Sequence, residues 1–185
     1  MPEELVFTFA RGQLADAILV ARKCTSCLVF VNLGSDRDTM LSEIERCLNR
    51  IFRRLRTKYV LEQDTLKDLS NIRESFENLL NGYSENHICS EYLYGTNFQR
   101  AVWEQLIKIP WGKTTTYKQI AIELGTPRSF RAVANACGAN PLPLVIPCHR
   151  VIGSSGSLGG FKWSLLLKHQ LLSREGKVVE SQSSR

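Results

Sequence analysis

Hydrophobic positions in the first ninety residues change from short runs to helical spacing. Runs of β-branched and aromatic residues at 5–9, 17–21 and 27–33 are separated by polar turn residues, which predicts an antiparallel meander. Two later sets recur at helical spacing, namely Leu41, Ile44, Leu48, Ile51, Phe52 and Leu55, then Leu66, Leu69, Ile72, Phe76, Leu79 and Leu80. We therefore expect a small α+β domain over residues 1–88.

The first of these helices has a capping residue and a strongly basic outer face. Asp36 or Asp38 is placed to cap its N-terminus. The face opposite the apolar stripe carries Arg46, Arg50, Arg53 and Arg54. Nothing in this half of the chain resembles a catalytic site, and its role is open.

The second half shows shorter helical patterns separated by strong breakers. A polar stretch at 83–91 separates the halves, and a helix over 98–107 ends before Pro110 and Gly112. Apolar residues repeat at helical spacing over 117–124 and 130–137, with Thr116 and Ser129 as predicted N-caps. Because a glycine turn joins them, this pair has the form of a helix-turn-helix. A last helix is predicted over 163–175, followed by a disordered tail at 177–185.

Charge separates the same two halves. The net charge is +6, but residues 1–91 carry 12 Lys and Arg against 14 Asp and Glu, whereas residues 92–176 carry 10 against 3. A basic second half predicts an anionic partner, with nucleic acid the first candidate, although a solvated basic surface shows the same charge. No stretch approaches the roughly 20 apolar residues of a membrane span. The N-terminus also lacks the features of a signal peptide. We therefore expect a cytosolic or nuclear protein with no membrane partner.

A reducing compartment predicts that all the cysteines are free thiols. The six are Cys24, Cys27, Cys47, Cys89, Cys137 and Cys148. Cys24 and Cys27 form a Cys-x-x-Cys pair, which with His87 and Cys89 supplies four zinc-binding side chains. Their spacing matches no compact zinc motif, and Cys27 begins a predicted strand. We therefore expect no metal and no other cofactor.

The stretch from Asn140 to Arg150 reads Asn-Pro-Leu-Pro-Leu-Val-Ile-Pro-Cys-His-Arg. Its prolines fix the backbone and remove donors, so we expect a buried, stiff, extended segment whose last residues are presented and not packed. His149 and Arg150 are neighbours that favour a thiolate, which predicts a lowered pKa for Cys148. The alternative is a structural cysteine, because free cysteines are commonly buried for packing.

Glu175 occupies an unfavourable position for an unpaired carboxylate. It lies on the apolar side of the last helix with Leu171 and Leu172, in the final turn, where the macrodipole disfavours negative charge. Buried charges are paired, so we expect His149 and Arg150 to contact it. The alternative is a frayed helix end with the carboxylate in water.

With these motifs the chain resembles the O6-alkylguanine-DNA alkyltransferases, closely over residues 95–176 and more loosely before. The motifs standing at that family's spacing are Thr-Thr-Tyr at 115–117, Arg-Ala-Val at 131–133, Asn140-Pro141, Ile-Pro-Cys-His-Arg at 146–150 and Glu175-Gly176. The resemblance implies an α+β fold in which a small ribonuclease-H-like domain at 1–88 precedes a mostly helical winged helix-turn-helix domain at 92–176. The second domain would carry the active-site cysteine.

The resemblance also implies a reaction and roles for particular residues. Cys148 would accept a methyl or other alkyl group from O6 of guanine in double-stranded DNA, irreversibly and once per molecule, after the damaged nucleotide is flipped out. His149 and Glu175 would withdraw the thiol proton through a water. Asn140 would hold the active-site turn, and Tyr117 would protonate the departing guanine.

The implied DNA contacts lie in the minor groove. Arg131 would fill the gap left by the flipped base. The residues expected near the DNA backbone are Tyr117, Lys118, Thr126, Ser129 and Ser154. The protein would act as a monomer, in the nucleus if the organism is eukaryotic and otherwise in the cytoplasm.

Two departures from the family leave the substrate range open. Phe161 stands where many relatives have tyrosine, and Gly138 where some have a second arginine. The preferred alkyl group and activity on O4-alkylthymine are not determined by the sequence. Rival interpretations are a damage-binding alkyltransferase-like protein, a dimeric helix-turn-helix regulator and a cysteine hydrolase. The first would lack the cysteine, the second has no visible dimerisation segment, and the third leaves the DNA-binding half unexplained.

Overall fold

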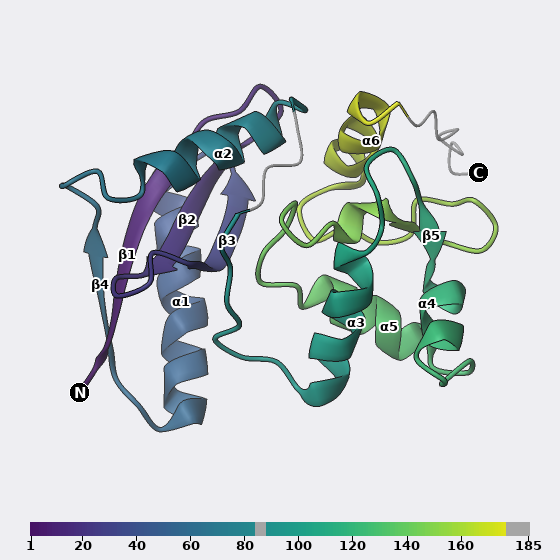
Figure 1. Ribbon diagram of the computed structural model, residues 1–185, viewed down its shortest axis with the longest axis horizontal. Helices are drawn as coiled ribbons and strands as arrows, with labels where there is room; N and C mark the ends of the chain where they lie inside the picture. Colours follow the sequence, from purple (N-terminus) through teal and green to yellow (C-terminus); the bar gives the residue numbers. More distant parts are fainter. Residues whose placement is uncertain (84–87, 177–185) are drawn as a thin grey trace. The chain divides into compact units, whose positions relative to one another are not determined.

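The computed structural model has an α+β fold and describes residues 1–83 and 88–176. The chain divides into two compact units, Met1–Tyr94 and Gly95–Arg185 (Figure 1). The predicted tail at 177–185 lies outside the described residues. No helix in the described parts of the chain is both long enough and apolar enough to cross a membrane.

A four-stranded sheet forms the centre of the first unit. β1 (Glu3–Ala10), β2 (Asp16–Arg22) and β3 (Leu28–Gly34) pair as the predicted antiparallel meander. β4 (Tyr59–Gln63) pairs in parallel with β1, which makes the strand order β3-β2-β1-β4. The sequence did not predict β4, because this edge strand contains no fully buried residue and therefore lacks a clear apolar pattern.

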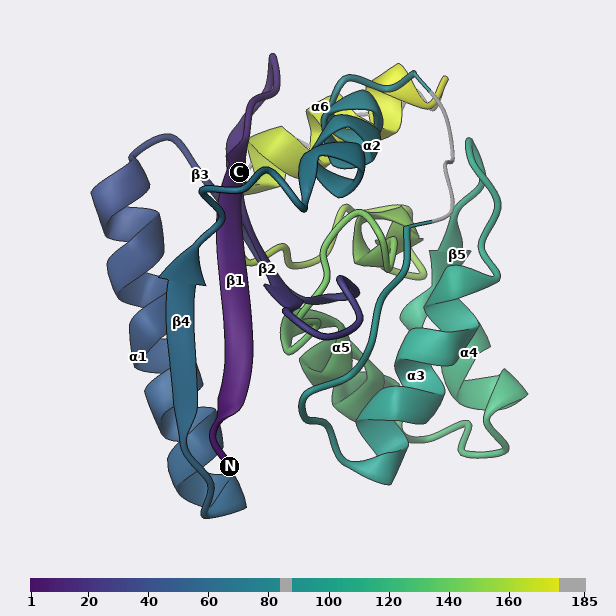
Figure 2. The ribbon, with the colours of Figure 1, turned by 60° about the vertical axis from the view of Figure 1, so that its left-hand side comes forward.

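One helix covers each face of this sheet. α1 (Arg37–Leu55) lies behind the sheet in Figure 1, and α2 (Ser70–Leu80) lies in front of it; Figure 2 shows the same arrangement from the side. Asp36 caps α1 as predicted, because its carboxylate accepts a hydrogen bond from the Thr39 N–H at 2.8 Å. The apolar stripe of α1 packs on the strands and closes the core. α2 begins later than predicted, since Leu66 is 82% exposed and does not belong to its stripe.

The second unit is mostly helical. Its helices are α3 (Asn97–Ile107), α4 (Tyr117–Glu123), α5 (Phe130–Gly138), a 3₁₀ turn (Cys148–Arg150) and α6 (Leu165–Arg174). Two short strands, β5 (Thr115–Thr116) and β6 (Val151–Ile152), pair in parallel. α4 and α5 pack together across the turn at Gly125, whose φ of 70° suits glycine.

Three details of this unit differ from the sequence prediction. Ser129 holds the N-cap position of α5, but its side chain makes no capping hydrogen bond. α6 begins at Leu165 and not at Trp163, because the Ser164 hydroxyl caps it by accepting from the Leu167 N–H at 3.0 Å. The short strands β5 and β6 were not predicted, since two-residue strands have no readable period.

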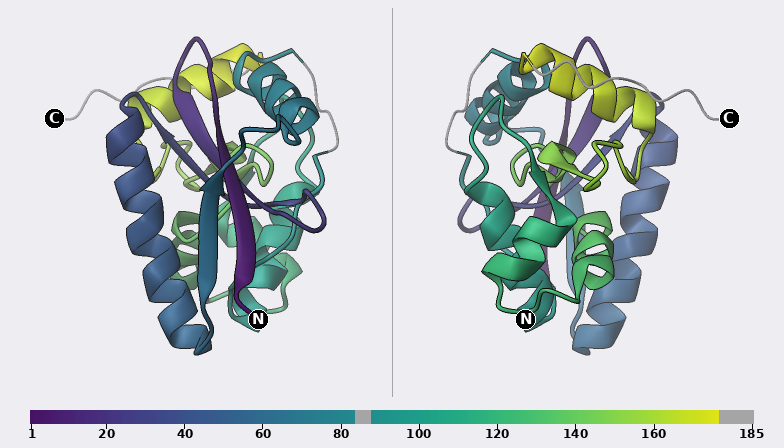
Figure 3. Two further views of the ribbon diagram at one scale, coloured as in Figure 1. Left: turned by 90° about the vertical axis from the view of Figure 1, so that its left-hand side faces the viewer. Right: turned by 90° about the vertical axis from the view of Figure 1, so that its right-hand side faces the viewer.

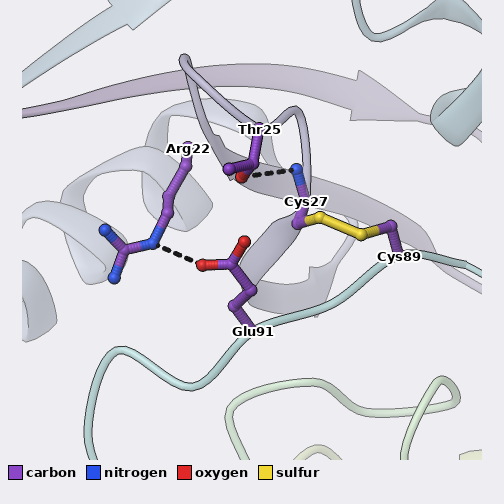
Figure 4. The surroundings of a disulfide bond; sticks show 5 residues. All are labelled: Arg22, Thr25, Cys27, Cys89 and Glu91. Atoms are coloured by element: carbon purple, nitrogen blue, oxygen red, sulfur yellow. Dashed lines mark hydrogen bonds and ion pairs between the residues drawn. A yellow bond between two sulfur atoms is a disulfide. The ribbon is translucent and has the colours of Figure 1, made fainter.

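The prediction of six free thiols is wrong, because Cys27 and Cys89 form a disulfide (Figure 4). Residues 88–91 run beside the start of β3: the Leu28 N–H donates to the Cys89 carbonyl, and the Glu91 N–H donates to the Leu28 carbonyl, both at 2.8 Å. This pairing brings the two Cα atoms to 4.8 Å, within the range that a disulfide requires. The charge pair between Arg22 and Glu91 lies alongside.

The disulfide also removes two of the candidate zinc-binding side chains. Cys27 and Cys89 are not available as thiolates, Cys24 is exposed, and His87 lies outside the described residues. Within residues 1–83 and 88–176, no group of three or more His, Cys, Asp or Glu side chains is arranged to hold a metal ion.

Candidate active site

Asn140 organises the turn that leads to the active-site segment. Its carboxamide oxygen accepts from the Leu142 N–H at 2.9 Å, and its amide group donates to the Ile146 carbonyl at 2.8 Å. Between these two points the chain reverses at Leu144, whose φ of 72° is in the left-handed region. One buried side chain therefore satisfies both ends of the turn and sets the direction in which residues 147–150 leave it.

The residues after this turn are packed inside the second unit. Cys148, His149 and Arg150 form a 3₁₀ turn and are 6%, 2% and 3% exposed. The predicted burial of the segment is confirmed, but the prediction that it is extended and presents its last residues is wrong. The prolines do prevent a long helix, but a single tight turn needs few backbone hydrogen bonds, and the apolar residues around it exclude solvent.

A buried charge cluster stands directly beside Cys148. His149 Nε2 lies 2.8 Å from Oε1 of Glu175, and the Arg150 guanidinium donates to both Glu175 oxygens at 3.0–3.1 Å. The carboxylate therefore has the partners that the sequence predicted, and it does not lie in water. The cluster also holds the loop that follows α3. Arg150 donates to the Ile109 carbonyl at 2.6 Å, and the Gly112 N–H donates to Glu175 at 3.2 Å.

Burial sets the protonation states of this cluster. It lowers the pKa of His149, so the imidazole is neutral near pH 7. Burial alone would raise the pKa of the Glu175 carboxyl, but hydrogen bonds from His149 and Arg150 and the charge of Arg150 outweigh it, and the pKa is lowered. Glu175 is therefore an anion that orients a neutral imidazole. The Nδ1 atom of that ring is buried and has no hydrogen-bond partner among the described residues.

The predicted lowering of the Cys148 pKa is wrong for the resting protein. Burial raises the pKa of this thiol, and a hydrogen bond from Asn140 and the charge of Lys168 oppose that effect only in part. The sequence showed cationic neighbours but not the desolvation. Cys148 is therefore held as a protonated thiol whose activation requires a base.

Lys168 is a site residue that the sequence reasoning missed. It is 0% exposed, and its ammonium donates to the carbonyls of Val151, Leu158 and Gly160 at 2.6, 2.5 and 3.3 Å. Burial lowers the pKa of Lys168 to about 8, against the opposing influence of Cys148 and Cys137. Its signal was visible: a lysine on the face of α6 that also carries Leu171 and Leu172.

Cys148 opens onto a small pocket of about 180 Å³. Tyr117 and Cys137 line it from α4 and α5, and Phe161 and Trp163 line it from the loop before α6. The two aromatic rings have centroids 5.1 Å apart. Because Lys168 holds the carbonyls of Leu158 and Gly160, it fixes the loop that carries this aromatic wall.

Tyr117 is a hydroxyl donor within the same pocket. Burial, followed by the influence of Cys137 and Cys148, raises the pKa of Tyr117 to about 12, so the phenol stays protonated at neutral pH. Gly159 passes against this ring: a Cβ there would lie 2.9 Å from the Tyr117 hydroxyl oxygen, and its φ of 66° favours glycine. The structure thus brings together Cys148, His149, Glu175, Asn140 and Tyr117.

Of the predicted DNA-contact residues, Tyr117 lines the pocket, and the others lie at the surface of the second unit. Arg131 is exposed in the first turn of α5, with its guanidinium 5.9 Å from the ring centroid of the exposed Phe130. Lys118 and Ser154 are exposed, and Thr126 and Ser129 are partly exposed around the turn between α4 and α5. These groups have the exposure that a contact with a large anion requires.

The arrangement is that of a nucleophile with a base and an acid. Cys148 and Tyr117 line one pocket, and the residue that follows Cys148 in the chain is His149, a neutral imidazole that Glu175 orients. The site therefore contains a base and an acid besides the thiol. Alkyl or acyl transfer to Cys148 fits this set of groups.

Comparison with known proteins gives a consistent picture. Residues 97–177 match the family described as 6-O-methylguanine DNA methyltransferase, DNA binding domain. A Saccharomyces cerevisiae protein named methylated-DNA–protein-cysteine methyltransferase is 38% identical, with 95% of each chain covered. A Candida glabrata protein of the same name is 35% identical, with 94% of this chain and 87% of the relative covered.

Solved structures share this fold. The Mycobacterium tuberculosis protein OGT, crystallised in complex with DNA, superposes with a TM-score of 0.70 at 26% identity, over 93% of this chain and 92% of that one. The similarity therefore includes both units and is not confined to residues 97–177.

Proposed function

The chain belongs to the methylated-DNA–protein-cysteine methyltransferase family, and from that premise we propose that Cys148 is itself the acceptor of the alkyl group. The substrate is a methyl or other alkyl group on O6 of guanine in double-stranded DNA, and each molecule acts once. The observation that carries the proposal is the position of Cys148 in one pocket with Tyr117 and beside the buried His149–Glu175 pair.

The proton path follows from the protonation states. The thiol proton passes through a water to Nδ1 of His149, while the Nε2–H of that ring donates to the Glu175 carboxylate. The thiolate attacks the alkyl carbon, an S–C bond forms, and the bond from that carbon to O6 breaks. The departing guanine takes its proton from the Tyr117 hydroxyl, which the raised pKa keeps in place as a donor. The thioether has no route back to a thiol, which limits each molecule to one transfer.

Base flipping follows from the enclosure of the thiol. A base stacked in a duplex cannot reach Cys148, which is 6% exposed, so the nucleotide must leave the stack at a cost of about a few kcal/mol. Arg131, exposed on the second helix of the α4–α5 pair, occupies the vacated space from the minor groove. The DNA backbone is contacted by Tyr117, Lys118, Thr126, Ser129 and Ser154. The excess of positive charge in residues 92–176 supports this assignment.

The finer fold assignments belong to the same proposal. The sheet order β3-β2-β1-β4, with a helix on each face, supports a ribonuclease-H-like first domain. The α4–α5 pair and the β5–β6 ladder support a winged helix-turn-helix second domain, which performs DNA binding and alkyl transfer. We also propose that the protein acts as a monomer, in the nucleus of a eukaryotic cell or otherwise in the cytoplasm.

Intact mass after incubation with a duplex that carries O6-methylguanine tests the proposal. The expected result is one added methyl, mapped to Cys148 and stopping at one equivalent, with no transfer by Cys148→Ala. Tight DNA binding without a mass change would identify a damage-binding protein instead. Arg131→Ala should slow transfer from duplex DNA more than transfer from the free base, and equal losses would contradict base flipping by Arg131. The same assay with O4-methylthymine determines whether that base is a second substrate.

A further inference from the structure

The first unit carries a basic groove that the reaction does not use. It lies between the C-terminal half of α1 and β4, which run side by side in Figure 2 and in the left view of Figure 3. We call it the α1–β4 groove and define it by Arg46, Arg50, Arg53 and Lys58. Its volume is about 680 Å³, and it is formed entirely by residues of the first unit.

Positive charge is concentrated here although this half of the chain is not basic. Residues 46–59 contain six of the 12 Lys and Arg in residues 1–91 and none of the 14 Asp and Glu. The four cations that define the groove form no ion pair with any residue in the described part of the chain. Their hydrogen bonds are local: Arg46 donates to the Ser42 carbonyl at 3.4 Å, and Arg50 contacts the Cys47 sulfur at 3.9 Å. Like charges that line one groove and have no ion-pair partner in the described part of the chain favour an anionic ligand.

Helix stability alone does not account for this arrangement. Cations stabilise the C-terminal end of a helix, but the effect is confined to its last turn. Arg53 and Arg54 lie in that turn, whereas Arg46 and Arg50 lie farther back along α1. They are exposed, so they also contribute little to packing.

Polar donors accompany the cations. The Tyr59 hydroxyl donates to Oδ1 of Asn49 at 3.1 Å, and both residues line the groove with Thr57. Burial and the nearby Glu45 charge raise the pKa of Tyr59, so its hydroxyl stays protonated. Arginine and lysine combined with threonine, asparagine and tyrosine are the side chains that proteins use to contact a nucleic-acid backbone.

The spacing of the cations selects a linear ligand. Arg46, Arg50 and Arg53 share one helix face and span about 10 Å at about 1.5 Å per residue. One DNA strand places a phosphate at about every 3.4 Å along the duplex axis, so this span corresponds to about three phosphates. The volume would admit a small polyphosphate, but a row of cations along an open groove fits a chain of phosphates better than a single compact group.

We propose that the α1–β4 groove binds the phosphate backbone of nucleic acid, as a second backbone contact besides that of the second unit. The inference rests on the proposed function, because that function brings the protein to DNA. It gives the first unit a part in holding DNA.

The test uses the full chain and a matched control. The groove variant is Arg46→Gln, Arg50→Gln, Arg53→Gln. The control, Arg11→Gln, Arg37→Gln, Lys67→Gln, removes the same charge from exposed positions of the same unit. Affinity for an undamaged duplex is measured at several salt concentrations. The slope of log K against log salt should become less steep by roughly 0.9 for each phosphate that the groove variant no longer binds, and change much less in the control. Equal changes in the two variants would overturn the proposal.

Two further measurements are made with the same variants. One tests whether the groove binds a different anion, and the other tests whether the proposed function itself is wrong. ATP and phosphatidylserine vesicles are tested with the same variants. If only the groove variant loses binding to one of these probes while its DNA slope is unchanged, the groove belongs to a small polyphosphate or a membrane, and the proposal is overturned. Methyl transfer to Cys148 is measured in parallel by mass. A wild-type protein without transfer would remove the proposed function, whereas an unchanged slope with normal transfer would remove only the groove contact.

Discussion

The Nε2 atom of His149 lies 2.8 Å from Oε1 of Glu175, and the two side chains are 2% and 4% exposed. A carboxylate at this position fixes which imidazole nitrogen carries the proton and leaves Nδ1 to act as an acceptor. The same carboxylate binds Arg150, which holds the loop at Ile109. The proposed proton relay and the packing of the second unit therefore share one side chain.

Glu175→Gln should impair both stability and transfer. Loss of the carboxylate leaves the Arg150 charge buried without its counter-ion, which typically costs about 3–5 kcal/mol. Because Glu175 would no longer orient the His149 imidazole as general base, transfer should slow by roughly 10²-fold or more in the molecules that remain folded. Urea unfolding and single-turnover kinetics measure the two effects, with Glu123→Gln at an exposed site as the control. An unchanged rate in the folded fraction would exclude Glu175 from the relay.

As the pH is lowered, the free energy of unfolding should fall over two separate pH ranges, or windows. The pKa of His149 is lowered below its usual 6.5, so as pH falls below about 6.5 the unfolded imidazole binds a proton before the folded one, and stability falls. The pKa of Glu175 is lowered below 4.5, so its stabilisation is complete above about pH 4.5 and is lost as pH falls through the lower folded value. Denaturation measured from pH 8 to about pH 2 should show both windows, and His149→Gln should remove the first. A first window that persists in that variant would point to another group.

Lys168→Met should raise the pKa of Cys148 further and loosen the pocket wall. The substitution keeps the length of the side chain but removes a positive charge that favours the thiolate. It also leaves three carbonyls without their donor, at about 1–3 kcal/mol for each buried group. The rate of Cys148 alkylation by iodoacetamide, measured against pH, should shift to higher pH. An identical pH profile in the variant would show that Lys168 acts only in packing.

Gly138→Arg should strengthen DNA binding without disturbing the fold. A Cβ at Gly138 would meet no atom within 4 Å, and a cation at the C-terminal end of α5 is favourable. The expected result is an unchanged or slightly higher melting temperature and a salt slope steeper by about 0.9, the value for one additional phosphate bound. Gly138→Gln is the uncharged control. A slope unchanged by the arginine would place this position away from the DNA.

Reduction of the Cys27–Cys89 disulfide should destabilise the first unit. The two residues are 62 positions apart, and closing a loop of that length corresponds to about 4 kcal/mol in the chain-entropy account. Cys89→Ser should lower the unfolding free energy by up to this amount and leave the alkylation of Cys148 unchanged. Thiol labelling of unfolded, unreduced protein should modify four cysteines, namely Cys24, Cys47, Cys137 and Cys148. Labelling of six would show that the bond is not formed.

Much of the fold was readable because its information is local. Apolar residues alternate or form short runs, as in strands, at 5–9, 17–21 and 27–33. Apolar residues recur at helical spacing in α1, α3 and α5, next to clear start and stop signals. β4 was not predicted, because its extended conformation depends on pairing with β1 and not on its own composition. The Cys27–Cys89 disulfide was not predicted, because nothing in the sequence shows that residues 88–91 run beside β3.

The chemical groups of the site could be named without a structure: the thiol, the imidazole and the carboxylate that needed a partner. How these groups behave depends on the folded environment. Desolvation is set by what surrounds an atom in space, so the folded chain is needed to show that Cys148 is buried and has a raised pKa, where its cationic neighbours had predicted a lowered one. The helical period alone places Lys168 on the apolar face of α6 with Leu171 and Leu172. Only the fold shows the three carbonyls to which its ammonium donates.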